Sequence, residues 1–138
     1  MFKFKKIKDK LVYQLDEKVC QKMFSIANQA VKNAYPKSAE GYSASVLTKK
    51  GHIYPGVSYN SDTLTLTMHS EAVALAHAVL HGEKDIIAIT GPNCHICKQL
   101  IWENSLRSGI DIIVVIKDKN RFKKIPISQL MPYPWPEK

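Results

Sequence analysis

MHSEAVALAHAVLHGEKDIIAITGPNCHICKQL, residues 68–100, contains two helical patterns joined by one short apolar run. Apolar residues recur on one side of residues 70–81, and Gly82 is placed to end that helix. The run DIIAIT, residues 85–90, is typical of a buried strand, and a further helix is expected from about residue 94 to 107. Strands separated by helices require crossover connections, so we expect helices to cover a sheet.

The flanking segments extend this pattern in both directions. Residues 16–34 carry apolar residues at helical spacing and are closed by Pro36, which predicts an amphipathic helix. The runs YSASVLT (42–48) and HIYPGVSY (52–59) flank a tight KKG turn and predict a hairpin. A second buried strand is expected in IDIIVVI, residues 110–116. The fold class is therefore α/β, a sandwich built on a mixed sheet.

Length and composition exclude several classes of protein. The 138 residues suit one domain, residues 1–138, around one hydrophobic core. A hydrophobic content of 45% and a charged content of 23% are ordinary for globular proteins. No apolar stretch approaches the roughly 18 residues of a membrane span, and the basic start MFKFKKIKDK lacks the apolar core of an export signal. We therefore expect a cytoplasmic protein with no membrane partner.

The net charge of +8 raises the question of nucleic acid, because basic domains often neutralise phosphates. Five lysines lie within residues 3–10, and a second group, KDKNRFKK, covers residues 117–124, where we expect a turn. Lysines spread in this way favour a solvated, solubilising surface. Nucleic acid remains the lesser alternative as a partner.

Three residues supply the donors that zinc prefers. His69 stands at the start of one predicted helix, and Cys94 and Cys97 stand at the start of the next. Each position follows a loop, so two helix N-termini can converge on one point, where their partial positive charge favours thiolates. A catalytic zinc keeps its fourth position for water. The remaining cysteine, Cys20, is expected to be a buried apolar residue of the first helix.

Glu71 gives this constellation a catalytic character. It lies two residues beyond His69, in the first turn of the helix, so it can approach a metal-bound water without being a ligand. A run of H-x-E followed by C-x-x-C matches the signature of zinc deaminases.

Two other interpretations of these residues stay open. A thioredoxin-like redox pair would leave His69 and Glu71 incidental. A structural zinc site would need a fourth protein ligand, and it would leave Glu71 unexplained. The candidates for that ligand are His95, His77, His81 and Cys20.

On these motifs the chain resembles the small cytidine deaminase family over nearly its whole length. SASVLTKKGHIYPG resembles the first hairpin of the family, HSE its first zinc motif and CHICKQ its second. LMPYP together with Trp135 resembles the C-terminal Leu-Leu-Pro-x-x-Phe ending. The resemblance implies a three-layer α/β/α sandwich with a mixed sheet of about five strands and a bound Zn²⁺. It also implies a homodimer or homotetramer in which Trp135 closes over a neighbour's substrate.

The first zinc motif departs from the family pattern. The family commonly has Cys-Ala-Glu-Arg, whereas this chain has His69, Ser70, Glu71 and Ala72. The histidine makes the ligand set one charge less negative than three cysteines. Zinc should therefore be at least as strong a Lewis acid here. A further departure is Asn93, which stands where the family has proline directly before the first cysteine.

The segment that binds the sugar in nucleoside-binding members departs as well. Their Gly-x-Asn-x-Glu is replaced by a run in which Ser58 and Asn60 stand at the Asn and Glu positions. Loss of the carboxylate removes a charge-assisted acceptor worth roughly 1.5 to 3 kcal/mol. Ser58, Asn60 and Ser70 are the candidate substrate contacts of this chain, with Trp135 as a contact from the C-terminus.

The sequence therefore predicts a zinc-dependent hydrolytic deaminase that releases ammonia from a cytosine-type nucleoside, cytidine, deoxycytidine or a modified analogue, as in pyrimidine salvage. Glu71 would carry protons from water to the ring nitrogen and to the leaving ammonia. The alternatives are a deaminase of another amino-heterocycle, a deaminase of bases in single-stranded nucleic acid, and a non-catalytic zinc or ligand-binding protein.

Overall fold

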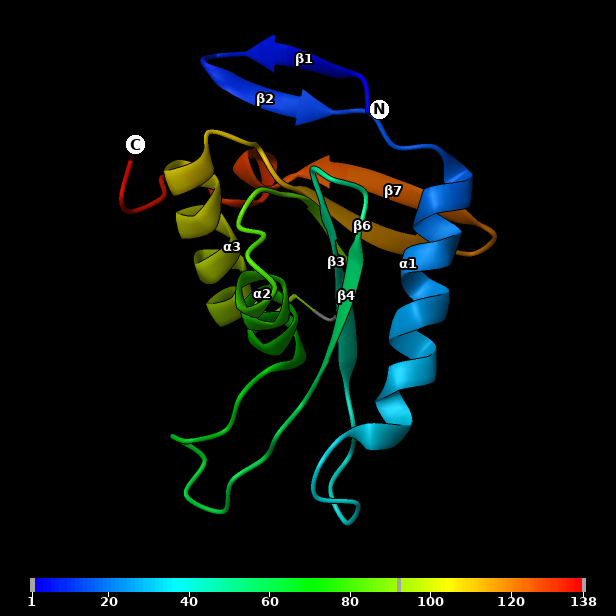
Figure 1. Ribbon diagram of the computed structural model, residues 1–138. Coiled ribbons are helices and arrows are strands. Elements are labelled where there is room, and N and C mark those ends of the chain that lie inside the picture. Colours follow the sequence, from blue (N-terminus) through cyan, green and yellow to red (C-terminus); the bar gives the residue numbers. More distant parts are fainter. Residues whose placement is uncertain (1, 92, 138) are drawn as a thin grey trace.

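The computed structural model describes residues 2–91 and 93–137. Two short strands come first, and a helix, a hairpin and two strand-linked helices follow (Figure 1). The strands are β1 (Phe4–Ile7), β2 (Lys10–Tyr13), β3 (Ser43–Thr48), β4 (Ile53–Val57), β5 (Ile86–Ile89), β6 (Ile113–Asp118) and β7 (Arg121–Pro126). The helices are α1 (Glu17–Ala30), α2 (Ser70–Leu80) and α3 (His95–Ser108), with 3-10 turns at Val31–Asn33 and Ile127–Leu130.

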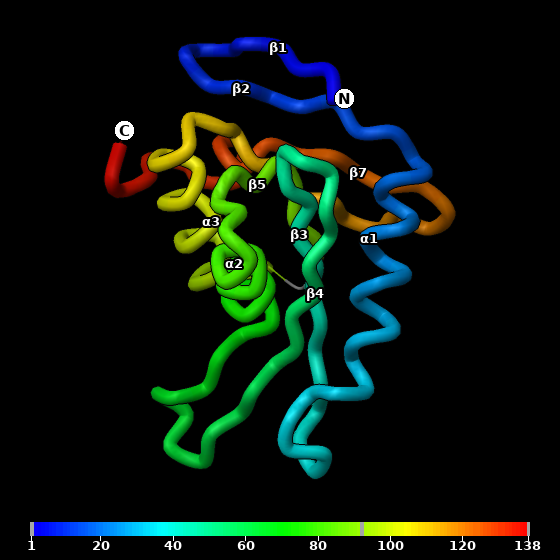
Figure 2. Tube along the Cα trace, viewed as in Figure 1, coloured from blue at the N-terminus to red at the C-terminus, as the bar shows by residue number. Residues whose placement is uncertain are grey.

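The main sheet has five strands in the order β4-β3-β5-β6-β7. Only β5 and β6 are parallel, and the other neighbours are antiparallel, so the sheet is mixed. Helix α1 lies on one face, and α2 and α3 lie on the other (Figure 1). The tube view shows the same arrangement, with α2 and α3 on one side of β3 and β4 and α1 on the other (Figure 2). The predicted α/β/α sandwich is confirmed.

Helix α1 follows the predicted amphipathic pattern. Asp16 caps it, accepting a hydrogen bond from the backbone N–H of Val19 at 2.8 Å. Cys20, Met23 and Ala27 are buried at the spacing of one helix face. The prediction that Cys20 is a core residue is confirmed, since its side chain is fully buried.

Two strand pairs differ from the sequence-based expectation. Residues 117–124 form the end of β6 and most of β7, and the turn between them contains Lys119 at a φ of 56°. Phe122 supports the hairpin by packing against Phe24 of α1 at a ring distance of 5.3 Å. The hairpin β1–β2 is the second addition, and its strands FKKI and KLVY do not alternate polar and apolar residues. In both places a lysine-containing strand departs from the period-two pattern by which half-buried strands are recognised.

Helix α2 approaches the sheet closely at Gly56 of β4. A Cβ atom on Gly56 would lie 2.2 Å from the backbone nitrogen of Ala74 and 2.4 Å from the carbonyl oxygen of Ser70. Only glycine fits between strand and helix at this distance. The contact fixes the first turns of α2, which carry Ser70 and Glu71, against the sheet.

A buried carboxylate ties down the opposite end of α2. Glu83 accepts hydrogen bonds from the Thr48 hydroxyl at 2.6 Å and from His52 Nδ1 at 2.7 Å, and a third from the hydroxyl of Tyr54. These bonds, with Thr48 and Tyr54 the strongest, hold the pKa of Glu83 at about 2, below its ordinary value of 4.5.

No helix among the described residues is long and apolar enough to cross a membrane.

The lowered pKa of Glu83 predicts a pH-dependent stability. The folded protein keeps Glu83 charged where the unfolded chain would protonate it, so its contribution is complete above about pH 4.5 and disappears towards pH 2. Urea unfolding of the wild type should show the free energy of unfolding falling through this window. Glu83→Gln should be less stable at pH 6 and show a shallower fall. Glu103→Gln, which removes one exposed i,i+4 pair, should keep the wild-type slope.

Candidate metal centre

Two helix N-termini place the predicted ligands together. His69 and Cys94 are the capping residues of α2 and α3, and both have extended backbone conformations. Cys97 lies in the first turn of α3. The ligand atoms of these three residues all lie within 4.8 Å of one another. The convergence expected from the sequence is therefore present in the fold.

The distances among these atoms fit a zinc ion. The two sulfur atoms of Cys94 and Cys97 are 3.6 Å apart, and Nδ1 of His69 lies 3.4 Å and 3.2 Å from them. Tetrahedral zinc with ordinary bond lengths separates two sulfurs by roughly 3.8 Å and a nitrogen from a sulfur by roughly 3.6 Å. All three cysteines of the chain are free thiols. The donor set thus matches a zinc centre with one position open.

The environment of Cys97 also favours a bound cation. Burial and, to a smaller degree, the nearby Glu71 carboxylate raise the pKa of its thiol well above the usual range. The thiolate is the form that binds metal, so a positive charge must compensate it at neutral pH. Zinc supplies that charge to two adjacent sulfurs at once.

Glu71 is held in a fixed position beside the metal ligands. Its side chain is 1% exposed. The Ser70 hydroxyl donates to Oε1 at 2.8 Å, and the backbone N–H of Asn93 donates to Oε2 at 2.5 Å. Gly91 packs closely against the same side chain, because a Cβ atom at Gly91 would lie 3.1 Å from two atoms of Glu71. The carboxylate therefore has little freedom to turn.

A pocket of about 310 Å³ opens in front of this carboxylate. Its size suits a small organic molecule. None of its side chains among the described residues is a lysine or an arginine. It is lined by Tyr42, Ser58, Asn60, Thr67, Met68, His69, Ser70, Glu71 and Cys94.

The predicted substrate contacts divide into two groups. Ser58, Asn60 and Ser70 all line the pocket, although the hydroxyl of Ser70 is directed to Glu71. Trp135 does not line it and is 78% exposed on the C-terminal segment, where its carbonyl oxygen accepts a hydrogen bond from Gln99. The contact that we predicted for Trp135 is not made with the pocket of its own chain.

Several pocket residues were not foreseen from the sequence. Tyr42 reaches the rim because its backbone N–H donates to the hydroxyl of Ser58 at 3.0 Å. Thr67 and Met68 come from the polar loop before α2, whose composition gave no sign of a binding role. The support of Glu71 by Asn93 is a backbone bond, and the positive φ of 51° that permits it agrees with an asparagine.

Comparison with known proteins assigns the family. Residues 17–115 match the family model described as the cytidine and deoxycytidylate deaminase zinc-binding region. The chain belongs to this family. A cytidine deaminase from Sodalis glossinidius (strain morsitans) is 35% identical over 74 residues, which are 51% of this chain and 23% of that protein. The match thus spans about a quarter of the length of the curated relative.

Solved structures agree on the fold. A cytidine deaminase from Burkholderia pseudomallei has a TM-score of 0.71 at 20% identity, over 83% of this chain and 98% of that one. A cytidine deaminase from Mycobacterium tuberculosis has a TM-score of 0.70 at 18% identity, over 88% of this chain and 98% of that one. At these identities the likeness shows a shared architecture.

The three ligands His69, Cys94 and Cys97 predict one zinc per chain. Inductively coupled plasma mass spectrometry of the purified protein measures this content. Cys97→Ser should bind zinc at least roughly 100-fold more weakly. Substitution of a group that only orients a zinc ligand already lowers zinc affinity, and loss of a ligand itself should lower it at least as much. Cys20→Ala is the matched control, since Cys20 is buried away from the ligand set, and it should retain full zinc. Equal zinc in both variants would contradict the site.

Proposed function

We propose that this protein is a zinc-dependent hydrolytic deaminase of a cytosine-type nucleoside. One observation carries the proposal. The buried Glu71 carboxylate accepts two hydrogen bonds that fix its position, and it lies beside three metal-ligating side chains at the end of a small pocket. Family membership supports the same chemistry. An open metal position next to a fixed carboxylate suits hydrolysis better than a structural or redox role.

Glu71 is the proton carrier of the proposed reaction. Bound zinc supplies a water of lowered pKa, so that hydroxide is available at neutral pH. One oxygen of Glu71 takes the proton from that water and passes it to the ring nitrogen of the substrate. The water oxygen would add to the amino-bearing ring carbon as the C–N bond breaks, and its second proton would travel by way of Glu71 to the amino group, which leaves as ammonia. The bonds from Ser70 and Asn93 keep the carboxylate aimed throughout these transfers.

The charge of the pocket favours an uncharged substrate. A phosphorylated nucleotide or a nucleic acid strand would bring at least one negative charge, and such ligands are bound by lysine, arginine or helix N-termini. The pocket lining has no lysine or arginine, and the two helix N-termini that reach it carry the metal ligands His69 and Cys94. We therefore favour a free nucleoside over deoxycytidylate and over a base in a strand.

Two polar residues are suited to the sugar. The Ser58 oxygen already accepts a bond from the backbone of Tyr42, so its own hydroxyl hydrogen is available to a ligand. Asn60 is half-buried in the pocket and offers both a donor and an acceptor. Neutral hydrogen bonds of this kind contribute about 0.5 to 1.5 kcal/mol each, so we expect a moderate affinity for ribose or deoxyribose.

The test is ammonia release from zinc-loaded protein. The panel is cytidine, deoxycytidine, deoxycytidine monophosphate, cytosine, guanine and a single-stranded oligonucleotide. We expect turnover of a free nucleoside. Glu71→Gln should lower kcat roughly 10² to 10⁴-fold while keeping its zinc, because it removes the proton carrier and preserves the shape. Glu103→Gln, a substitution of the same type on α3, should retain wild-type activity.

Each other result points to a different function. Release from deoxycytidine monophosphate or from the oligonucleotide alone would overturn the choice of a neutral substrate. Release from guanine alone would indicate another amino-heterocycle. Full zinc with no ammonia from any compound, and ligand binding that Glu71→Gln leaves unchanged, would indicate a non-catalytic binding protein.

We also propose that the chain assembles as a homodimer or homotetramer through a surface beside the zinc ligands. Leu64, Leu66 and Ile96 are 79%, 69% and 73% exposed, an unusual density of bare apolar side chains. Leu64 and Ile96 line another hollow, of about 370 Å³, that also includes His69 and Cys97. A neighbouring chain there would cover apolar surface and narrow the entrance to the site.

Light scattering during size-exclusion chromatography tests the assembly. The wild type should elute with the mass of two or four chains. Leu64→Ser with Ile96→Ser should shift it towards one chain, whereas Val79→Ser with Leu80→Ser, equally exposed at the far end of α2, should leave it unchanged. A monomeric wild type, or dissociation by the Val79 and Leu80 pair alone, would contradict this interface.

A further inference from the structure

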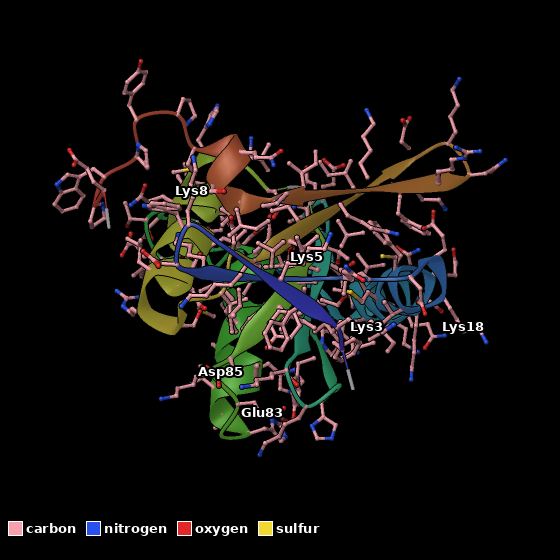
Figure 3. All side chains as sticks on the ribbon, turned by 90° about the horizontal axis from the view of Figure 1, so that it is seen from above. Lys3, Lys5, Lys8, Lys18, Glu83 and Asp85 are labelled. Atoms are coloured by element: carbon pink, nitrogen blue, oxygen red, sulfur yellow. The ribbon has the colours of Figure 1, made fainter. Side chains whose placement is uncertain are left out.

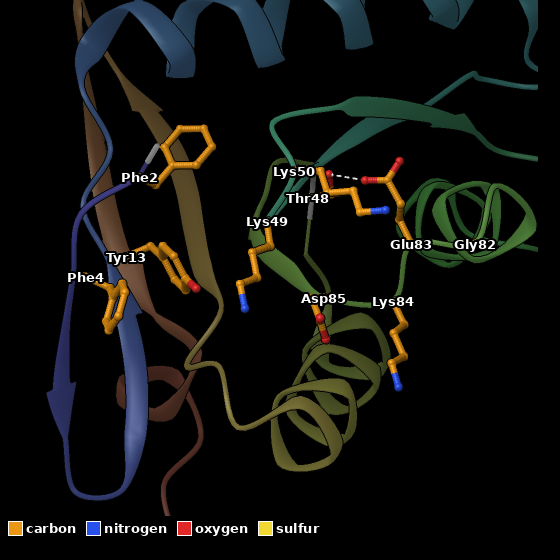
Figure 4. A pocket seen from close by; sticks show the side chains of 10 residues that line it. All are labelled: Phe2, Phe4, Tyr13, Thr48, Lys49, Lys50, Gly82, Glu83, Lys84 and Asp85. Carbon is orange, nitrogen blue, oxygen red and sulfur yellow. Dashed lines mark hydrogen bonds between the residues drawn. The ribbon is translucent and has the colours of Figure 1, made fainter.

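A second pocket, of about 500 Å³, lies beneath the N-terminal hairpin β1–β2. We call it the hairpin pocket. Aromatic rings form one wall, and the turn after β3 and the loop between α2 and β5 form the other (Figure 4). Its characteristic side chains are Phe2, Phe4, Tyr13, Lys49, Lys50 and Lys84.

The aromatic wall offers rings to a flat ligand. Phe4 and Tyr13 are directly opposite one another in the β1–β2 ladder, and their ring centroids are 5.4 Å apart. Tyr13 is buried, whereas Phe4 is 54% exposed, which is unusual for a phenylalanine. Exposed aromatic faces in a basic hollow are the surfaces on which nucleobases stack.

The opposite wall carries three lysines and two carboxylates. Lys49 points into the space between Tyr13 and Asp85 (Figure 4). None of Lys49, Lys50 and Lys84 forms an ion pair within the described residues. Glu83, a carboxylate engaged by three donors, and Asp85 are the two acidic groups of the pocket, so its three lysines leave a net charge of +1.

The basic surface continues beyond the pocket. Seen from above, Lys8, Lys5, Lys3 and Lys18 follow one another across the hairpin and onto α1 (Figure 3). Residues 3–13, the hairpin and the residue before it, carry five lysines and one aspartate. A row of cations of this length suits a ligand with several phosphates in sequence.

We propose that the hairpin pocket and this lysine row bind single-stranded nucleic acid. Bases stack on Phe4, and Lys49, Lys84 and the hairpin lysines neutralise the phosphates. The site is separate from the metal centre, because the metal ligands lie at the start of α2 and the pocket lies past its end, an 11-residue helix or about 16 Å away. Binding here therefore does not require the strand to be a substrate.

Two other occupants fit less well. A single nucleotide would use the pocket and leave the lysine row without a role. An anionic membrane would need a broad apolar face, whereas Phe4 and Ile7 are the only large apolar side chains of the hairpin that are exposed among the described residues. A strand uses both the aromatic wall and the extended row of charge.

The test is fluorescence anisotropy of a labelled 15-nucleotide oligo(dT) with the whole zinc-loaded protein. Neutralisation of four phosphates predicts that affinity falls roughly 50-fold between 50 and 200 mM salt. Lys49→Gln with Lys84→Gln should weaken binding roughly tenfold and reduce the salt slope by about 1.4. Phe4→Leu, which keeps apolar bulk and removes the ring, should also weaken binding roughly tenfold.

The matched control is Lys32→Gln with Lys37→Gln, two exposed lysines at the opposite end of the molecule. This pair loses the same charge and should change the affinity less than twofold. Glu71→Gln should bind the strand as the wild type does, so failure of the proposed deaminase would leave this result intact. Circular dichroism checks that each variant is folded.

Three results would overturn the proposal. The first is equal weakening by both lysine pairs, which would indicate net charge alone. The second is full displacement of the strand by a deoxycytidine monophosphate concentration equal to that of its nucleotides, which would indicate a mononucleotide pocket. The third is binding to vesicles rich in phosphatidylserine with no binding to oligo(dT).

Discussion

The close approach of α2 to β4 at Gly56 is the contact on which the metal centre depends. Any side chain at that position would meet the backbone of Ala74 and of Ser70. The first turn of α2 is therefore fixed relative to the sheet, and with it the positions of His69 and Glu71. The cysteines arrive from α3, which starts after the neighbouring strand β5, so the site is the meeting point of two independently anchored helices.

Much of the fold could be predicted because its signals are local. Buried strands such as β5 are apolar runs, and helix ends are marked by Gly82 and Gly109, both with positive φ. The strands β1 and β7 could not be predicted in this way, because lysine and arginine occupy half of their positions and interrupt the apolar pattern. Their pairing depends on partners elsewhere in the chain, such as Phe24 for Phe122.

The candidate site likewise has one part that could be predicted from the sequence and another that could not. The metal ligands and Glu71 follow from residue type and helix position, which the sequence contains. The direction of the Ser70 hydroxyl, towards Glu71, and the backbone bond from Asn93 do not, because they depend on three-dimensional placement. The resemblance gives the Asn93 bond a further meaning: a proline at that position has no N–H, so it could not hold Glu71 in this way.

Helix α2 is secured at both of its ends, by Gly56 near its start and by the hydrogen bonds of Glu83 just after its end. A helix that is fixed at both ends cannot shift to accommodate a different ligand. Variation in what the pocket accepts must then arise in the loop of residues 59–68, which supplies Asn60, Thr67 and Met68. The fixed carboxylate and the loop that shapes the pocket are thus separate parts of the chain, and either can change during evolution while the other is preserved.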